Sequence, residues 1–235
     1  GDRIRMSGHH SDPGVFVRSL STKGAHGGLS RVVRASVRLL DAFGFDRVFV
    51  ESVGVGQTEL DVVKASDTVV VVLVPEAGDS VQAMKAGLME IGDVYVVNKA
   101  DRNGADQLAS VVESEVTAGA GGWSWSPPVL TTRADHRDGV AELLQAIDRH
   151  KDHLTEGPEF EQRRRARRRA ELSDAVGEAI QVALAGLDVD GLLGDISDAV
   201  ASGEVDPYTA AAGALASDDV AFRLSEALRR AADGR

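Results

Sequence analysis

The sequence lacks several patterns that would point to particular classes of protein. None of its 235 residues is cysteine, which excludes a disulfide framework and a zinc site built on thiolates. No apolar run reaches the roughly 18–20 residues of a membrane-spanning helix, and the opening residues Gly-Asp-Arg-Ile-Arg have no apolar segment of the kind found in signal peptides. The net charge of −11 argues against nucleic acid as a partner, because phosphate backbones select clustered Lys and Arg. We therefore expect a cytoplasmic protein that binds neither nucleic acid nor membrane.

Aromatic residues are scarce too, at 4%, although apolar residues make up 43% of the chain. Val, Leu, Ile and Ala must therefore fill the core, as they do in parallel sheets covered by helices. Continuous apolar or β-branched runs predict strands over 47–53, 68–74, 93–97 and 129–132. Apolar residues at helical spacing predict helices over 31–43, 79–91, 104–118 and 138–154. Strands that alternate with helices predict an α/β fold with a mostly parallel sheet and helices on both faces.

The composition changes near Gly157-Pro158, after which no convincing strand follows. A long helix over 159–186 is expected there, with six arginines between Arg163 and Arg169. Shorter helices are expected over 189–202, 207–215 and 217–232. The chain is therefore predicted to consist of an α/β domain over 1–156 and a helical extension over 157–235.

The strongest functional signal is Asn98-Lys99-Ala100-Asp101, which directly follows the predicted strand 93–97. Ligands of open parallel sheets bind at the carboxyl ends of the strands. A carboxylate at that place can accept from both N1–H and the 2-amino group of guanine, which adenine lacks. The Asn side chain can serve the opposite edge of the base, and the Lys stem can lie over its plane. The tetrapeptide therefore predicts a guanine-nucleotide site.

A second signal is the stretch from Glu51 to Gln57, Glu-Ser-Val-Gly-Val-Gly-Gln. An acid at a strand end, followed three residues later by Gly54, is the layout of a segment that senses a γ-phosphate. Glu51 could hold Mg²⁺ through water or orient the attacking water, and Gly54 could bring an amide close to the phosphate. A strand-terminal Glu before a glycine turn is the alternative interpretation of the same residues.

A third and weaker signal is Leu130-Thr131-Thr132-Arg133-Ala134. In G proteins the loop after this strand supplies a backbone amide to guanine O6, usually from an Ala, and Ala134 is suitably placed. The phosphate-binding motif Gly-x-x-x-x-Gly-Lys-Ser/Thr is absent from the sequence. We expect its place to be upstream of Gly1, and we expect this chain alone to bind GTP poorly.

Taken together, these motifs resemble the MeaB/ArgK family of GTPases that act with methylmalonyl-CoA mutase. The resemblance is close over 1 to about 155. It rests on these stretches: Gly1–Met6, Phe16–Ser19, Gly27–Ser30, Glu51–Gln57, Gly78 and Asp79 with Gln82 and Lys85, and Asn98–Asp101.

The resemblance implies a P-loop NTPase-type fold that hydrolyses GTP with Mg²⁺, here without its N-terminal strand and P-loop. By resemblance, Asp2 and Glu51 are metal-network residues, Glu51 and Gly54 catalytic residues, and Asn98, Lys99, Asp101 and Ala134 nucleotide-binding residues. Asp79, Gln82 and Lys85 would belong to a switch segment coupled to the mutase. The implied role is that of a chaperone for adenosylcobalamin loading and mutase protection, in a homodimer held partly by the helical extension.

Two alternatives remain open at this point. The chain could be a truncated, non-hydrolysing form that keeps only the dimer and partner surfaces, as the missing phosphate loop suggests. It could also be a nickel-inserting GTPase, although a chain with no Cys and only 6 His has few of the metal ligands that such proteins use.

Overall fold

The computed structural model describes residues 6–9, 11–20, 31–52, 65–75, 88–119, 124–157, 159–189 and 193–233. The chain divides into two compact units, Gly1–Gln162 and Arg163–Arg235. Among the helices described, none is long and apolar enough to cross a membrane.

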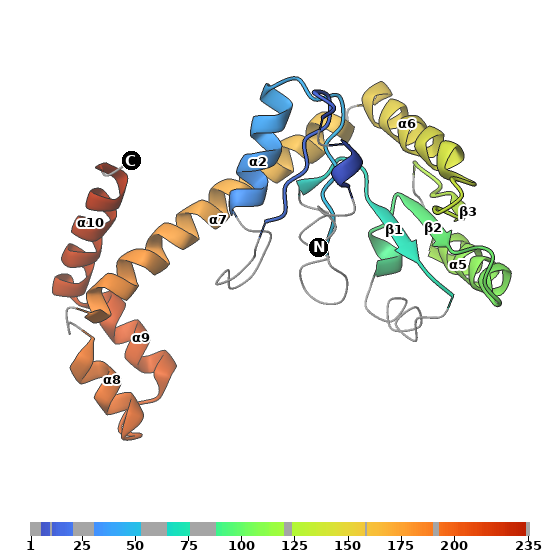
Figure 1. Ribbon diagram of the computed structural model, residues 1–235. Helices are drawn as coiled ribbons and strands as arrows, with labels where there is room; N and C mark the ends of the chain where they lie inside the picture. Colours follow the sequence, from blue (N-terminus) through green and yellow to red (C-terminus); the bar gives the residue numbers. More distant parts are fainter. Residues whose placement is uncertain are drawn as a thin grey trace. The chain divides into compact units, whose positions relative to one another are not determined.

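The first unit is built on a three-stranded parallel sheet (Figure 1). Its strands are β1 (Val70–Leu73), β2 (Val94–Asn98) and β3 (Val129–Thr132), in that spatial order. β2 is the central strand, and its first four residues are buried. Three of the predicted strands are thus confirmed to within a few residues, and their carboxyl ends meet at one edge of the sheet.

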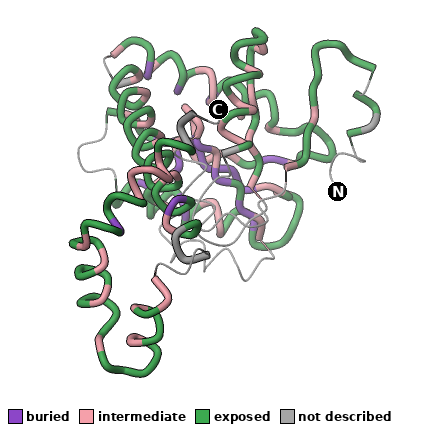
Figure 2. The backbone as a smooth tube through the Cα atoms, turned by 90° about the vertical axis from the view of Figure 1, so that its left-hand side faces the viewer, coloured by how far each residue is buried: buried purple, intermediate pink, exposed green. Residues whose placement is uncertain are grey.

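Helices cover both faces of this sheet, because successive strand residues point to opposite sides. Tyr95 of β2 packs with Val112 and Val116 of α5 (Ala105–Gly119). Val94 and Val96 pack instead with Ala146 of α6 (Val140–Glu156). In Figure 2 the buried positions follow the strands at the centre of this unit. The predicted α/β arrangement is confirmed.

The strand predicted for 47–53 is wrong for the residues described, because 47–52 form no ladder with any described strand. A strand exists only where backbone groups find a partner strand. Arg47 is held instead by an ion pair with Asp148 of α6, at 2.9 Å from Nη2 to Oδ1. The helix predicted for 79–91 falls mostly outside the described residues, and its end is the short 3-10 helix η2 (Leu88–Glu90).

Two elements lie earlier in this unit. The 3-10 helix η1 (Ser7–His9) is short, and α2 (Arg31–Ala42) matches the predicted amphipathic helix. α2 is followed by a turn at Gly44, whose φ of 85° lies in the left-handed region that glycine adopts without strain. Several large apolar side chains of this segment are exposed, among them Val32, Leu39 and Phe43.

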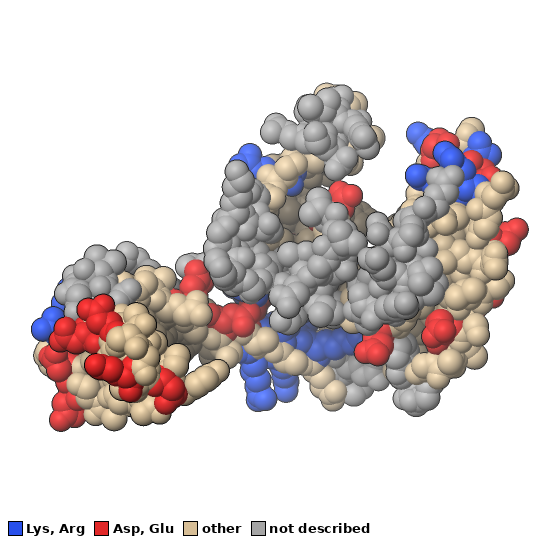
Figure 3. Space-filling view, turned by 90° about the horizontal axis from the view of Figure 1, so that it is seen from below, with Lys and Arg blue, Asp and Glu red and all other residues tan. Residues whose placement is uncertain are grey.

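The second unit is entirely helical where it is described. α7 (Glu159–Val189) begins in the first unit and continues into the second, followed by α8 (Gly194–Ala201), α9 (Pro207–Ala216) and α10 (Asp218–Asp233). α9 packs against α8 and α10. Asp206 caps α9 by accepting from the Tyr208 and Thr209 amides, which lowers the pKa of its carboxyl. Acidic side chains gather on this unit in Figure 3.

Candidate functional site

The turn that follows β2 carries the predicted nucleotide-binding residues Asn98, Lys99 and Asp101. Lys99 adopts a φ of 59°, a left-handed conformation that is uncommon outside glycine and clusters at functional sites. The Arg102 amide closes the turn on the Lys99 carbonyl at 2.9 Å, and the Ala100 amide donates to the Thr132 carbonyl at 3.0 Å. The turn is therefore fixed to the end of β3, while the Lys99 side chain is exposed.

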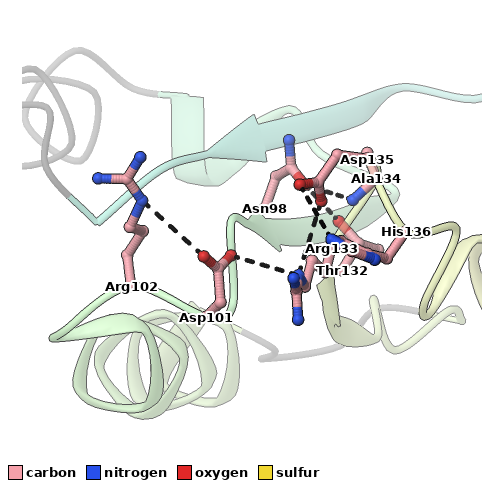
Figure 4. Close-up of polar contacts among 8 residues, drawn as sticks. All are labelled: Asn98, Asp101, Arg102, Thr132, Arg133, Ala134, Asp135 and His136. Carbon is pink, nitrogen blue, oxygen red and sulfur yellow. Dashed lines mark hydrogen bonds and ion pairs between the residues drawn. The ribbon is translucent and has the colours of Figure 1, made fainter.

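Asn98, the last residue of β2, is oriented by two donors from the β3 side. The Thr132 hydroxyl donates to Asn98 Oδ1 at 3.1 Å, and the Ala134 amide donates to the same oxygen at 3.3 Å (Figure 4). Thr132 is buried, so this contact is shielded from water. With both donors on the oxygen, the side-chain NH₂ of Asn98 stays available as a donor to a ligand.

Asp101 lies between two arginines (Figure 4). Arg102 Nε is 3.9 Å from Asp101 Oδ2, and Arg133 Nε is 4.0 Å from Asp101 Oδ1. Both distances exceed the approximately 2.7–3.2 Å of an N–H···O hydrogen bond. The carboxylate therefore lies near two cations and hydrogen-bonds to neither Nε atom, so both of its oxygens can accept from a ligand. Its side chain is 42% exposed.

These side chains offer three kinds of contact to a planar base. Asp101 offers two acceptor oxygens, the Asn98 amide nitrogen offers a donor, and Lys99 offers an aliphatic stem ending in a cation. A base with two adjacent N–H donors on one edge and acceptors on the other matches this set, and guanine has that pattern. Adenine has no such pair of donors next to each other.

A cavity of about 700 Å³ adjoins the turn. Its lining includes Ala100 and Asp101 of the turn, Arg133 and Gly139 after β3, and Glu113 of α5. It runs along β3, and its lining includes neither Asn98 nor Lys99, so the turn 98–101 lies at its border. Chemical complementarity to a base resides in the turn, and the cavity provides open space next to it.

Apart from the residues above, Glu51 is the one predicted site residue within the described part of the chain. Glu51 is exposed, and no described hydrogen bond or ion pair joins it to Asn98 or Asp101. Asp2, Gly54, Asp79, Gln82 and Lys85 lie outside the described residues. Within the described part of the chain, no three His, Asp or Glu side chains form a cluster that could hold a metal ion.

Sequence reasoning missed the residues that support the site. The sequence predicts Thr132 only as part of a strand, and Arg133 only as a neighbour of Ala134. Thr132 contacts Asn98, which lies 34 residues earlier in the sequence, and Arg133 contacts Asp101, which lies 32 residues earlier (133 − 101). Only the expectation that parallel strands end at one edge could have suggested these contacts.

Comparison with known proteins finds a matching protein family. The family model described as methylmalonyl-CoA mutase-associated GTPase MeaB matches residues 1–186. A Pyrococcus horikoshii protein with GTPase in its name is 44% identical over 221 residues, covering 90% of this chain and 67% of that protein. GTPase ArgK of Escherichia coli is 34% identical over 166 residues, covering 69% of this chain and 50% of that protein.

Among solved structures, the crystal structure of a LAO/AO transport system kinase superposes with a TM-score of 0.58 at 27% identity. It covers 83% of this chain, which spans 61% of that protein, so the chain is similar to about half to two thirds of these relatives. The fold is that of the P-loop GTPases, as the sequence predicted. The match over most of its length shows that the chain belongs to the MeaB family of methylmalonyl-CoA mutase-associated GTPases.

Proposed function

We propose that this chain carries the guanine-reading part of a GTPase that serves methylmalonyl-CoA mutase. In this proposal Asp101 accepts from N1–H and the 2-amino group, the Asn98 amide donates to N7, and Lys99 covers the base. The observation that carries the proposal is the cross-strand support of this turn by Thr132 and Ala134. A solvated polar turn has no need of a buried hydroxyl to orient its Asn.

Ala134 is proposed to donate its backbone amide to guanine O6. In the structure this amide donates to Asn98 Oδ1 at a long 3.3 Å. A guanine O6 atom placed beside it would share that amide or replace Asn98 as its acceptor.

The phosphate end of the site is proposed by resemblance. Mg²⁺ would be held by Asp2 and Glu51, where it would screen the phosphate charge, and Gly54 would lie by the γ-phosphate. Glu51 is exposed, so its carboxylate is accessible to a metal ion. Because the sequence has no Gly-x-x-x-x-Gly-Lys-Ser/Thr motif, we expect the affinity of this chain to depend mainly on the base contacts.

The wider role is proposed from the family description, which names the mutase as the associated enzyme. The protein would act as a chaperone for adenosylcobalamin loading and for protection of the mutase, with Asp79, Gln82 and Lys85 coupling nucleotide state to it. It would do so as a homodimer that uses the helical extension. Nucleotide-dependent co-sedimentation with methylmalonyl-CoA mutase tests this role, and equal association with and without GTP would contradict it.

The base-reading proposal is tested by titrating the ¹⁵N-labelled chain with GDP and, separately, with ADP. We expect GDP to shift the amide signals of Ala100, Asp101 and Ala134 saturably, and ADP to leave them in place. Chemical-shift titration also detects weak binding, which suits a site lacking the phosphate loop. Equal shifts with both nucleotides, or none with GDP, would contradict the proposal.

A further inference from the structure

The Arg133 side chain contacts carboxylates in the loops after both β2 and β3. Its backbone is fixed first: the Arg133 amide donates to the Asp138 carbonyl at 3.0 Å, and the Asp138 amide returns a bond to the Arg133 carbonyl at 3.2 Å. These two bonds close the turn 133–138 and set where the side chain begins. The guanidinium is thus placed by the fold.

The side chain then reaches across to the turn after β2. Arg133 Nε lies 4.0 Å from Asp101 Oδ1 and 3.7 Å from Asp135 Oδ1 (Figure 4). Nε is itself buried and has no hydrogen-bond acceptor among the described residues. The cation therefore stands between two carboxylates without saturating either of them.

Arg102 holds the other oxygen of the same carboxylate, with Nε 3.9 Å from Asp101 Oδ2. The two arginines thus flank Asp101 from both sides, one per oxygen. Two-point recognition of N1–H and the 2-amino group needs both carboxylate oxygens in the plane of the base. A carboxylate that is 42% exposed would otherwise rotate among several orientations.

We propose that Arg133 is a specificity-determining positioning residue, which holds Asp101 in the orientation that recognises the 2-amino group of guanine. The inference rests on the proposed function, since it assumes that Asp101 reads the base. The ion-pair distance is essential to it: a direct Arg133–Asp101 hydrogen bond would occupy an oxygen that the base requires.

The test compares GDP with inosine diphosphate, which lacks only the 2-amino group. Dissociation constants for both are measured by amide-shift titration for the full chain, for Arg133→Met and for Arg149→Met. Arg149 is an exposed residue of α6, and its substitution makes the same change in charge away from the turn. In the unsubstituted chain GDP should bind more tightly than inosine diphosphate.

Arg133→Met should reduce this preference roughly two- to five-fold, the range typical of exposed ion pairs. Arg149→Met should leave it unchanged. A purely structural role of Arg133 would weaken both nucleotides equally, and an unchanged ratio would therefore overturn the inference. A tighter binding of GDP by Arg133→Met would overturn it as well, because Arg133 would then be a competitor of the base.

A second measurement separates this inference from the proposed function. Thermal unfolding of Arg133→Met, Asp101→Asn and the double variant forms a cycle that measures the coupling of the two side chains without any nucleotide. Additive effects would overturn the inference even if GDP binds selectively. Coupling without binding of either nucleotide would overturn the proposed function and the specificity role together, and would reduce Arg133 to a structural ion pair.

Discussion

Gly139 combines a left-handed backbone with a close neighbour at the end of β3. Its φ is 74°, and a Cβ at this position would overlap the carbonyl oxygen of Thr131. It precedes α6 directly, so any shift would move the helix that covers one face of the sheet. Gly139 is thus the residue at which the turn after β3 passes directly into α6.

Gly139→Ala should therefore lower the free energy of unfolding by about 2–4 kcal/mol, from backbone strain plus displacement of Thr131. Gly104→Ala is the matched control, because Gly104 has a similar φ of 87° but open space around it. It should cost about 1 kcal/mol. Urea unfolding of both variants measures the difference, and equal losses would show that the Thr131 contact has no energetic weight.

Tyr95 is a second residue whose role is set by burial. Its side chain is fully buried in β2, and its hydroxyl donates to the Met89 carbonyl at 2.6 Å and accepts from the Gly92 amide at 3.2 Å. Burial raises the pKa of this hydroxyl above 10.0, and the charge of Asp93 raises it further, against the Gly92 bond. The folded protein thus keeps the proton at pH values where the unfolded chain loses it.

A raised pKa in the folded state means that this contribution is fully present below pH 10.0 and is lost as pH rises through the folded-state value. The free energy of unfolding should therefore fall as the pH rises above about 10, and should fall less in Tyr95→Phe. That variant should also lose about 1–3 kcal/mol at neutral pH, because the Met89 and Gly92 groups become unpaired. Parallel pH profiles for both proteins would contradict the assignment.

At the scale of elements, α6 is attached to the sheet by a buried histidine. His150 Nδ1 lies 2.9 Å from Thr68 Oγ1, ahead of β1, and Nε2 lies 3.2 Å from Asp93 Oδ1, ahead of β2. Trp125 packs on the imidazole at 4.9 Å between ring centroids and donates to the Asp93 carbonyl. One side chain thus connects α6 to the amino ends of two strands, opposite the edge that carries Asn98 and Asp101.

His150→Ala should lower the free energy of unfolding by about 2–4 kcal/mol, since it opens a cavity and removes the partner of the Thr68 hydroxyl. The neighbouring Arg149→Ala, on the exposed side of α6, should change it by less than about 0.5 kcal/mol. Denaturant unfolding followed by Trp fluorescence reports both, because Trp125 lies against the histidine. A loss no larger than that of Arg149→Ala would contradict this attachment.

Elements were predicted well where local pattern alone decides them. The residues 94–97 are Val, Tyr, Val and Val, a pattern typical of a strand covered on both faces, and they lie in β2. The segment 47–53 has equally good strand propensity, but 47–52 have no partner strand among the described elements. Pairing is a property of two segments, so single-segment propensity could not foresee this.

The site divides in the same way. Asn98–Asp101 could be read from the sequence because its function needs only residues next to one another at a strand end. The Arg133–Asp101–Asp135 arrangement and the Thr132–Asn98 bond depend on how two loops meet in space. No spacing within either loop encodes these contacts.

At the scale of the whole molecule, the helical unit is sparsely buried: among its described residues only Ala183 and Val220 are buried. α7 carries a row of exposed apolar side chains one turn apart, Leu172, Val176 and Ile180. Such a row is the kind of helix face that pairs with another helix. It supports the proposal that a second copy of the chain associates through the helical extension.

We expect the sedimentation coefficient of the chain to rise with concentration, and Leu172→Glu to weaken self-association at least about ten-fold, because the carboxylate would be desolvated in the interface. Val182→Glu is the control, as Val182 is 62% exposed on the same helix but lies off the row. Analytical ultracentrifugation of the three proteins decides the matter. A concentration-independent monomer, or equal effects of both variants, would contradict the proposed interface.

The central claim is that Asp101 reads the base, and base preference after Asp101→Asn tests it most directly. An amide at this position can accept from N1–H but donates where the carboxylate accepted, which suits the 2-carbonyl of xanthine and repels the 2-amino group of guanine. Dissociation constants for GDP and xanthosine diphosphate are measured for both proteins by amide-shift titration. We predict that GDP binds more tightly than xanthosine diphosphate to the unsubstituted chain and that Asp101→Asn reverses this order, by at least about ten-fold in the ratio. An unchanged preference in Asp101→Asn would show that the base is read elsewhere, and would contradict the account.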